Sequence, residues 1–272
     1  MQTFKVNGAA LAGEEHGMGE PLILVHGAVG DFRTWETVVA TLATHYRTIT
    51  YSRRWHYPNP VPTDGEAYTP DGHAADLEAL IAACGGGPVR LLGHSYGAAI
   101  CAGLAAARPE LVRSLVLAEP SLFGMALTNP IGAVAMAQTA AATMHVVPLL
   151  RSGERERGLR EFLNSVIGKE GYARLSDRVL QVMSDNVSTL EPMLNGMRAG
   201  LSFTGKQAAR IQAPTLLVEG EHTTTLFRTT MKALAQTVPK AERAVIPKVG
   251  HGLHLEDPVA FCRVALEFLT RR

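Results

Sequence analysis

The chain has 272 residues, of which 46% are hydrophobic, and its 26 basic and 25 acidic residues give a formal net charge of +1. A chain of this length can bury the core of one large domain with an inserted lobe. The even balance of charge along the chain excludes a basic surface for DNA, RNA or an anionic membrane. We therefore expect a small, largely uncharged molecule as the partner.

The cysteines and the apolar segments bear on where the protein works. Cys84, Cys101 and Cys262 are widely spaced and form neither a CxxC pair nor a Cys/His group of the zinc-binding type. Reduced thiols that pack as small apolar side chains are the simplest interpretation. We see neither the apolar stretch of a signal peptide nor about 18 uninterrupted apolar residues. These observations predict a cytoplasmic protein with no membrane contact and leave a homodimer open.

Short β-like runs alternate with helical runs along most of the chain. The first part predicts, in order, a strand at 22–25, a helix at 34–44, a strand at 47–51, a helix at 70–83, a strand at 89–92, a helix at 96–107 and a strand at 114–118. The last part predicts a strand at 215–219, a helix at 227–238, a strand at 243–246 and a helix at 258–269. This alternation predicts an α/β fold with a mostly parallel sheet covered by helices on both faces.

The alternation stops between about residues 123 and 204. This segment begins with a helical stretch rich in Ala and Met at 131–144, continues through a charged run at 151–160, and then shows amphipathic periodicity. We interpret 123–204 as a helical cap inserted between two strands. Residues 1–122 and 205–272 then form the α/β core.

Residues 89–97 contain an apolar run that ends in Gly-His-Ser-Tyr-Gly and passes directly into a helical stretch of small residues. This is the sequence form of a nucleophile elbow centred on Ser95, in which a serine stands on a tight turn between a strand and a helix. Gly93 and Gly97 remove side chains that would collide in such a turn. The pattern alone is weak in a chain with 26 glycines, and its strand and helix context strengthens the prediction.

A serine is a poor nucleophile at neutral pH unless a base accepts its proton, so a histidine must lie close to it. His251 follows the last predicted strand and precedes the last predicted helix, which places it at the carboxyl end of the sheet beside the elbow. His254 is the competing base, but we expect it at the entry to the final helix, at the surface or in a satisfied polar contact. We predict His251 as the base.

An oxyanion formed by attack of serine on a carbonyl needs hydrogen-bond donors that are in place before the reaction. The backbone N–H groups of Tyr96, directly after the nucleophile, and of Ala28, directly after His26-Gly27, are suited to this role. Val29 replaces Ala28 if the loop is registered one residue later. His26 is then a structural residue that braces the turn.

Three segments together resemble the α/β-hydrolase family with a helical cap, over essentially the full length of the chain. They are His26-Gly27, the Gly-His-Ser-Tyr-Gly elbow around Ser95, and Gly250-His251, in the expected order and separation. The resemblance implies the α/β-hydrolase fold, a twisted and mostly parallel sheet flanked by helices, and a serine, an acid and a histidine in this chain order.

The acid departs from the commonest pattern of the family. Members that resemble this chain usually carry an aspartate in a Gly-x-x-Asp segment after the strand predicted at 215–219, and this chain has Thr223 there. Some branches place the acid after the strand that follows the nucleophile helix, where this chain has Glu119. A glutamate at the end of an apolar strand is costly without a partner. We predict Glu119 as the acid, with Glu221 or a purely structural ion pair of Glu119 as alternatives.

The loop at 51–59 departs from the family too, because bulky residues replace the glycines of the Asp-x-Arg-Gly-x-Gly-like pattern. Trp55, His56 and Tyr57 predict a loop that narrows the pocket and contacts substrate, together with Val29. Packing within an aromatic-rich loop is the alternative for His56. Arg53 or Arg54 braces the loop or anchors a substrate carboxylate.

The function that follows is cleavage of a carboxylic ester, lactone or thioester of a small, largely apolar substrate through an acyl-enzyme. A serine nucleophile argues against the epoxide hydrolases and haloalkane dehalogenases of the family, which need a carboxylate. No metal or organic cofactor is expected, because His-Glu-x-x-His, cysteine pairs and Gly-x-Gly-x-x-Gly are absent from the sequence. The alternatives are a cofactor-free lyase, cyclase or oxygenase that uses the Ser-His pair for proton transfer, and a non-hydrolytic small-molecule receptor.

Overall fold

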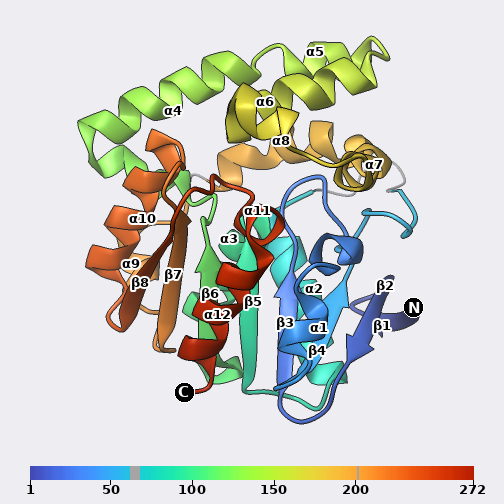
Figure 1. Ribbon diagram of the computed structural model, residues 1–272, viewed down its shortest axis with the longest axis vertical. Helices are drawn as coiled ribbons and strands as arrows, with labels where there is room; N and C mark the ends of the chain where they lie inside the picture. The colour runs from blue at the N-terminus through green and yellow to red at the C-terminus, as the bar shows by residue number, and fades with distance from the viewer. Residues whose placement is uncertain (62–67, 201) are drawn as a thin grey trace.

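The computed structural model describes residues 1–61, 68–200 and 202–272 and shows an eight-stranded sheet with helices on both faces and a helical layer across one end (Figure 1). The two gaps fall in the predicted core and cap, one in each. The strands are β1 (Gln2–Val6), β2 (Ala9–His16), β3 (Pro21–Val25), β4 (Arg47–Tyr51), β5 (Val89–His94), β6 (Val112–Ala118), β7 (Thr215–Gly220) and β8 (Ala241–Ile246).

The strand order across the sheet is β1-β2-β4-β3-β5-β6-β7-β8. Every pair from β4 to β8 is parallel, and the β1-β2 hairpin joins β4 in the antiparallel sense. The hairpin is missing from the sequence prediction because its residues mix Gly, Ala and Glu at an edge of the sheet, where the buried apolar run of an inner strand is not required. β5 lies at the centre, so the elbow that follows it has strands on both sides.

Each inner strand serves two separate cores because its side chains alternate between the faces of the sheet. Ile23 and Val25 of β3 pack on one face, whereas Leu22 and Leu24 pack on the other. The first face is covered by α2 (Pro70–Ala83), α3 (Tyr96–Ala107), α9 (Gly205–Ala208) and α10 (Thr225–Thr237). The second is covered by α1 (Val39–Leu42) and α12 (Pro258–Leu269), with α11 (Leu253–Glu256) directly before α12.

The helix predicted at 34–44 is two short pieces, a 3-10 turn η1 (Phe32–Trp35) and α1. Asp31 caps η1 by accepting a hydrogen bond from the Arg33 backbone N–H at 2.9 Å. The cap competes with a continuous helix, which the apolar periodicity alone does not reveal. A second 3-10 turn, η2 (Pro109–Leu111), leads from α3 into β6.

The chain between β6 and β7 forms the helical layer at the top of Figure 1, beyond the carboxyl ends of the parallel strands. Its elements are η3 (Phe123–Thr128), α4 (Pro130–Thr143), α5 (Val146–Arg151), α6 (Arg155–Ala173), α7 (Asp177–Asp185), η4 (Val187–Thr189) and α8 (Leu190–Gly200). Among the described residues of 123–204 none is in a strand. This arrangement places the helical layer over the elbow.

Candidate active site

Ser95 lies on a tight turn between β5 and α3. Its backbone has φ 53° and ψ −117°, a strained conformation for a non-glycine residue. A Cβ atom added to Gly93 would lie 2.6 Å from the Ala98 Cα, and one added to Gly97 would lie 2.1 Å from the Val25 carbonyl oxygen. Both glycines are therefore required by close backbone approach, and the turn lifts the serine out of the sheet.

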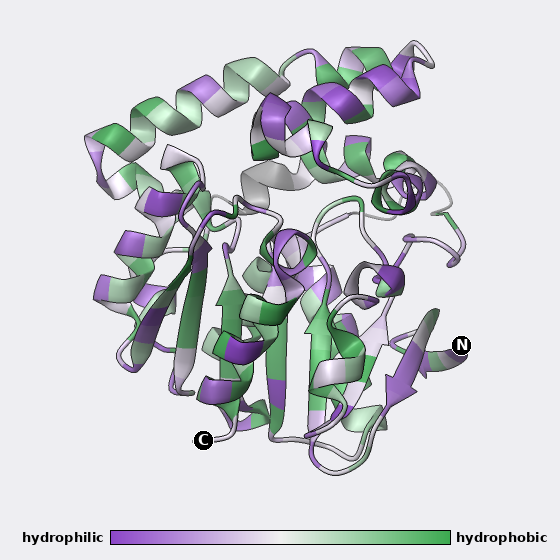
Figure 2. Cartoon of the chain, viewed as in Figure 1, coloured by the Kyte–Doolittle hydropathy of each residue, from purple (hydrophilic) through white to green (hydrophobic). Residues whose placement is uncertain are grey.

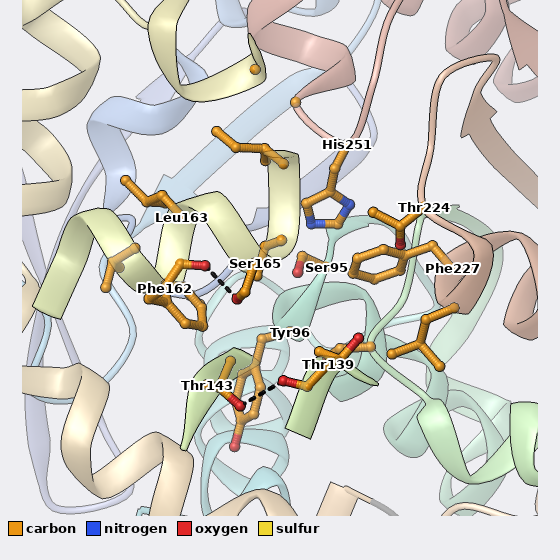
Figure 3. A pocket seen from close by; sticks show the side chains of 18 of the residues that line it. Ser95, Tyr96, Thr139, Thr143, Phe162, Leu163, Ser165, Thr224, Phe227 and His251 are labelled. Atoms are coloured by element: carbon orange, nitrogen blue, oxygen red, sulfur yellow. Dashed lines mark hydrogen bonds between the residues drawn. The ribbon is translucent and has the colours of Figure 1, made fainter. Parts of the chain in front are cut away.

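His251 lies in the loop after β8, and its imidazole meets the carboxylate of Glu119, which directly follows β6. The distance from His251 Nδ1 to Glu119 Oε2 is 2.7 Å, and both side chains are buried. Because Nδ1 is engaged by the acid, Nε2 is the ring nitrogen left for proton transfer. Figure 3 shows the His251 ring beside Ser95 at the wall of one pocket.

Glu119 is fully buried, and three donors surround its carboxylate. Oε1 accepts the Gly220 backbone N–H at 2.8 Å, and Oε2 accepts the Thr223 hydroxyl at 2.7 Å in addition to the His251 ring. Each oxygen of the buried carboxylate therefore has at least one hydrogen-bond donor. Thr223, at the position where the sequence analysis expected the acid of the family, thus donates to Glu119.

Glu221 has a different environment. Its side chain is 54% exposed, and Oε2 accepts the backbone N–H of Lys248 at 2.9 Å. No hydrogen bond between Glu221 and His251 occurs in the described part of the chain. The geometry therefore favours Glu119 over Glu221 as the partner of the imidazole.

A second carboxylate holds the loop that carries His251. Glu256 on α11 accepts the backbone N–H groups of Gly250 and Gly252, each at 3.2 Å, on the two sides of the histidine. A Cβ atom added to Gly250 or Gly252 would lie 3.3 or 3.2 Å from its Oε1, so the glycines make room for the carboxylate. Sequence reasoning missed this residue, although the Gly-His-Gly segment with a glutamate on the next turn is a visible signal.

Two aromatic rings fix the imidazole from the side. Phe227 stacks on His251 with a centroid distance of 4.0 Å and an interplanar angle of 19°. The His94 ring Nε2 donates to the His251 carbonyl oxygen at 2.9 Å. Burial, reinforced by the neighbouring His254 and His251, holds the pKa of His94 well below its usual value, so His94 is a neutral donor.

His254 is fully buried rather than at the surface, which corrects the expectation from the sequence. Its ring packs between Trp35 and His94 at centroid distances of 4.7 and 4.6 Å. Neither ring nitrogen has a hydrogen-bond partner among the described residues. Burial, followed by the charge of His251, lowers the pKa of His254 to about 3. The side chain is an uncharged core residue.

The oxyanion loop after β3 is held from behind by Arg53. The Gly27 carbonyl oxygen accepts hydrogen bonds from Arg53 Nη2 and His26 Nδ1, each at 2.9 Å, and the His26 carbonyl accepts from Arg53 Nε at 3.2 Å. In a trans peptide the next N–H points away from the carbonyl, so anchoring Gly27 turns the Ala28 N–H to the opposite side. Ala28 and Tyr96 both line the pocket that contains Ser95.

His26 is fully buried, and its Nε2 accepts the Arg53 backbone N–H at 2.9 Å. Burial, followed by the charge of Arg53, holds its pKa well below the usual value. The ring is therefore a neutral brace. Val29 has φ 47° and also lines the pocket.

The loop at 51–59 packs behind the oxyanion turn, and none of its residues lines the pocket. His56 is fully buried, donates from Nδ1 to the Gly30 carbonyl at 2.6 Å and accepts the Tyr68 hydroxyl at Nε2. Trp55 packs against Tyr68 at 5.4 Å, and Tyr57 is half exposed with the Arg33 guanidinium over its ring. The predicted substrate contacts of Trp55, His56 and Tyr57 are thus replaced by packing contacts.

The two arginines of this loop have separate partners. The guanidinium of Arg53 donates hydrogen bonds to backbone carbonyls and, at 2.8 Å, to the Tyr68 hydroxyl. Arg54 Nη2 pairs with Asp76 at 2.6 Å. Both act as braces, and neither lines the pocket as an anchor for a substrate carboxylate.

The pocket has a volume of about 370 Å³ and lies between the elbow and the helical layer (Figure 3). Most of its wall is apolar, and much of it comes from the segment that runs from α4 to α7. The apolar side chains of that segment in the wall include Met136, Met144, Val147, Phe162, Leu163, Val166 and Met183. None of the lining residues that the structure describes is Lys or Arg, and Glu256 is the one with a formal negative charge.

Three hydroxyl groups in the cap part of the pocket wall are engaged by their own helices, whereas the buried Tyr96 hydroxyl has no hydrogen-bond partner among the described residues. The Thr139 hydroxyl donates to the Ala135 carbonyl at 3.0 Å. Thr143 donates in the same way to Thr139 at 2.9 Å and Ser165 to Phe162 at 2.6 Å (Figure 3). They offer a ligand only acceptor lone pairs. Such a wall favours an uncharged, apolar ligand. Within the described residues no group of three or more His, Cys, Asp or Glu is arranged to hold a metal ion.

The comparison with known proteins agrees with this fold. The family model of the alpha/beta hydrolase fold matches residues 20–258. The chain is 26% identical over 261 residues to the sn-1-specific diacylglycerol lipase ABHD11 of Mus musculus, covering 92% of this chain and 80% of the lipase. It is also 26% identical over 263 residues to the 2-hydroxy-6-oxo-6-(2'-aminophenyl)hexa-2,4-dienoic acid hydrolase of Metapseudomonas resinovorans, covering 95% and 87%.

Among solved structures, the enol-lactonase from Burkholderia xenovorans superposes with a TM-score of 0.80 at 18% identity, covering 98% of this chain and 99% of the lactonase. A likeness at that identity describes the fold. The match of the family model covers most of the chain and shows that this protein is a member of the alpha/beta-hydrolase family.

Proposed function

We propose that the protein is a serine hydrolase that cleaves a carboxylic ester, lactone or thioester with an apolar acyl or alkyl part. The observation that carries this proposal is the buried 2.7 Å contact between His251 and Glu119, beside an elbow serine in an apolar pocket. A base oriented by an ionised acid next to a serine is the arrangement that acyl transfer requires.

In the proposed reaction His251 accepts the proton of Ser95 as the serine oxygen attacks the substrate carbonyl. The tetrahedral intermediate collapses when His251 returns the proton to the leaving oxygen or sulfur atom, which leaves an acyl-enzyme. Water then attacks the acyl group with His251 as the base, and Ser95 is released. Glu119 orients the ring and stabilises the imidazolium throughout without itself becoming protonated.

The negative charge of each tetrahedral intermediate is assigned to the backbone N–H groups of Ala28 and Tyr96. A preorganised donor of this kind contributes roughly 3 to 4 kcal/mol to transition-state stabilisation. The hydrogen bonds of Arg53 and His26 to the Gly27 carbonyl support this assignment, because they fix the peptide whose N–H must point at the oxyanion.

The pocket wall supports an uncharged substrate. The mouse relative is named as a diacylglycerol lipase, and the Metapseudomonas relative is named for a dienoic acid. A carboxylate buried in a pocket without a cationic partner would carry an uncompensated charge. The absence of Lys and Arg from the described lining therefore favours neutral esters over acids for this chain.

The test is reaction with a fluorophosphonate probe, with the modified residue located by mass spectrometry. We expect a stable adduct on Ser95 in the native chain and none in Ser95→Ala. An ester and lactone panel of graded acyl length, run with both proteins, then identifies the substrate class. No adduct on Ser95 would contradict the proposal and favour a receptor. Partial turnover by Ser95→Ala would favour proton-transfer chemistry.

A further inference from the structure

The outer surface of the cap carries an apolar face with no charge. Residues 120–150 contain no Asp, Glu, Lys or Arg, whereas 19% of the whole chain is charged. This stretch includes α4 and most of α5, which lie at the top of the molecule in Figure 1, with the sheet below them. A solvent-exposed helix normally carries charged residues on its outer face. The charge-free stretch therefore calls for an explanation.

The exposed part of this stretch is made mainly of large apolar side chains, alanines and prolines, with Thr128, Gln138 and His145 as its exposed polar side chains. The exposed fractions are 46% for Leu127, 64% for Ile131, 58% for Val134 and 64% for Met144. We call these four residues, with the exposed alanines of α4 between them, the outer cap face. Four of the ten large hydrophobic side chains exposed among the described residues lie here, and Figure 2 shows α4 mostly in the colours of apolar and neutral residues.

The outer cap face is continuous with the pocket. Thr139 and Thr143 of α4 and Val147 of α5 line the pocket on the inner side of the same helices. Ala140 and Met144 are exposed to solvent and also line the pocket. An apolar route therefore leads from the outside of the cap to the cavity beside Ser95.

We propose that the outer cap face docks on the surface of a lipid bilayer, from which an uncharged ester enters the pocket. The proposal rests on the proposed function, because the route has a purpose only if the pocket takes an apolar ester. A charge-free face matches the acyl region of a bilayer and needs no anionic headgroups. A protein partner on this face would instead cover Ala140 and Met144 at the edge of the pocket.

In the proposed docking, α4 and α5 lie along the membrane surface and do not cross the bilayer. The segment Pro130–Arg151 is long and apolar enough, by length and composition alone, to cross a bilayer. In this structure it is two helices separated at 144–145, and their inner sides form part of the pocket wall. Insertion as one spanning helix would dismantle that wall, whereas docking leaves it intact. This proposal departs from the expectation of no membrane contact, which rested on the even charge balance and on the lack of about 18 uninterrupted apolar residues.

The test is flotation of the full chain with small unilamellar vesicles of dioleoylphosphatidylcholine, at low and high salt. We expect the native chain to bind equally at both salt concentrations, and the double variant Ile131→Glu, Val134→Glu to lose about tenfold or more in partition coefficient. The matched control is Val259→Glu, since Val259 is 78% exposed on α12, outside the cap. It should bind like the native chain.

Three results would overturn the proposal. The first is failure of the native chain to float with the vesicles, and the second is equal binding of the double variant and the native chain. The third is a dimer of the native chain in light scattering that becomes a monomer in the double variant, which would make the outer cap face a contact between two copies. Flotation of Ser95→Ala and turnover of a water-soluble ester by the double variant separate this question from the proposed function. We expect Ser95→Ala to float like the native chain. We expect the double variant to turn over the water-soluble ester like the native chain, because neither Ile131 nor Val134 lines the pocket.

Discussion

At the residue scale, the site is defined by a carboxylate at Glu119 together with a hydroxyl at Thr223. Glu119, the proposed acid, directly follows β6, and Thr223 donates to it at 2.7 Å. A carboxylate at both positions would bring two negative charges together in a buried space, which is unfavourable. The hydroxyl of Thr223 therefore complements Glu119, and the two residues form one hydrogen-bonded unit with His251.

We expect Glu119→Gln to lower kcat by about 10³- to 10⁴-fold, because a neutral amide stabilises neither the correct tautomer nor the imidazolium. Glu221→Gln should leave kcat nearly unchanged, since Glu221 is half exposed and bonds to the Lys248 backbone. Steady-state turnover of a short-chain ester measures both. A larger loss in Glu221→Gln would reverse the assignment of the acid.

The geometry also offers a rescue. Thr223 Oγ1 and His251 Nδ1 both lie 2.7 Å from Glu119 Oε2, so an aspartate at 223 can approach the imidazole. We expect Thr223→Asp to restore at least about tenfold of the kcat lost by Glu119→Gln. In the native background the same substitution should reduce kcat through repulsion of Glu119. No rescue would show that the backbone at 223 cannot position an acid.

The buried His254 makes stability depend on pH. Its pKa is lowered to about 3 from an unfolded value of 6.5, so protons bind preferentially to the unfolded chain as the pH falls below 6.5. At pH 5.0 this costs about 2 kcal/mol of unfolding free energy relative to pH 7.5. The stability contribution is present above pH 6.5 and is lost as the pH falls towards 3.

We expect His254→Leu to remove this loss. In urea unfolding, the loss of unfolding free energy from pH 7.5 to pH 5.0 should be about 2 kcal/mol smaller for the variant than for the native chain. The measurement at pH 7.5 serves as the reference for the packing change itself. Parallel stability curves for the two proteins would mean that His254 is protonated in the folded state.

At the element scale, short loops held by specific acceptors and donors position the catalytic groups. Arg53, on the loop after β4, holds the oxyanion turn after β3. Glu256, on α11, holds the loop after β8 through the N–H groups that flank His251. In each case a buried or half-buried charged side chain satisfies backbone groups that a turn leaves without partners. Rigid placement of a base in this way is worth up to about 100-fold in rate.

We expect Glu256→Ala to lower kcat for a neutral ester by about tenfold or more, with less than a threefold change in KM, because the loop of His251 loses both acceptors. Glu256→Gln should recover part of the loss, since its amide oxygen can still accept one N–H. Arg174→Ala is the matched control, because Arg174 contacts the same carboxylate at 3.3 Å without touching the loop. An equal loss in that control would assign the effect to the cap contact.

At the scale of the whole molecule, the cap meets the core by two different kinds of contact. Near α4, the aromatic rings of Phe123 and Phe227 pack together at 5.3 Å within a small apolar cluster. At the end of α7 the contact is polar, because buried Asn186 donates to Asp31 Oδ2 at 2.7 Å and accepts the Tyr57 N–H at 2.8 Å. The polar contact specifies where the far end of the cap sits.

We expect Asn186→Ala to lower the unfolding free energy by about 2 to 3 kcal/mol, because it leaves buried polar groups without partners. KM for an apolar ester should rise several-fold, since α7 carries Met183 in the pocket wall. Gln181→Ala is the control, because Gln181 is exposed and bonds within α7 to Asp185. Urea unfolding and steady-state kinetics measure both effects.

The sequence by itself determined the fold class and the elbow. Apolar strands in alternation with helices can be buried only in a sheet covered on both faces, and Gly93, Ser95 and Gly97 encode a local turn whose geometry depends on residues close in the chain. The α/β-hydrolase family predicted from those segments is confirmed by the family match over residues 20–258. The hairpin at the sheet edge and the break between η1 and α1 were not predicted, because neither needs a distinctive apolar period.

Only the tertiary structure decided which side chains meet. Glu119 and His251 are 132 positions apart, and their contact depends on the register of β6, β7 and β8. The same packing turned the loop at 51–59 behind the oxyanion turn and buried His254 among aromatic rings. Local sequence specifies periodicity and turn chemistry, whereas the direction in which a loop residue points depends on the space left by elements distant in the chain.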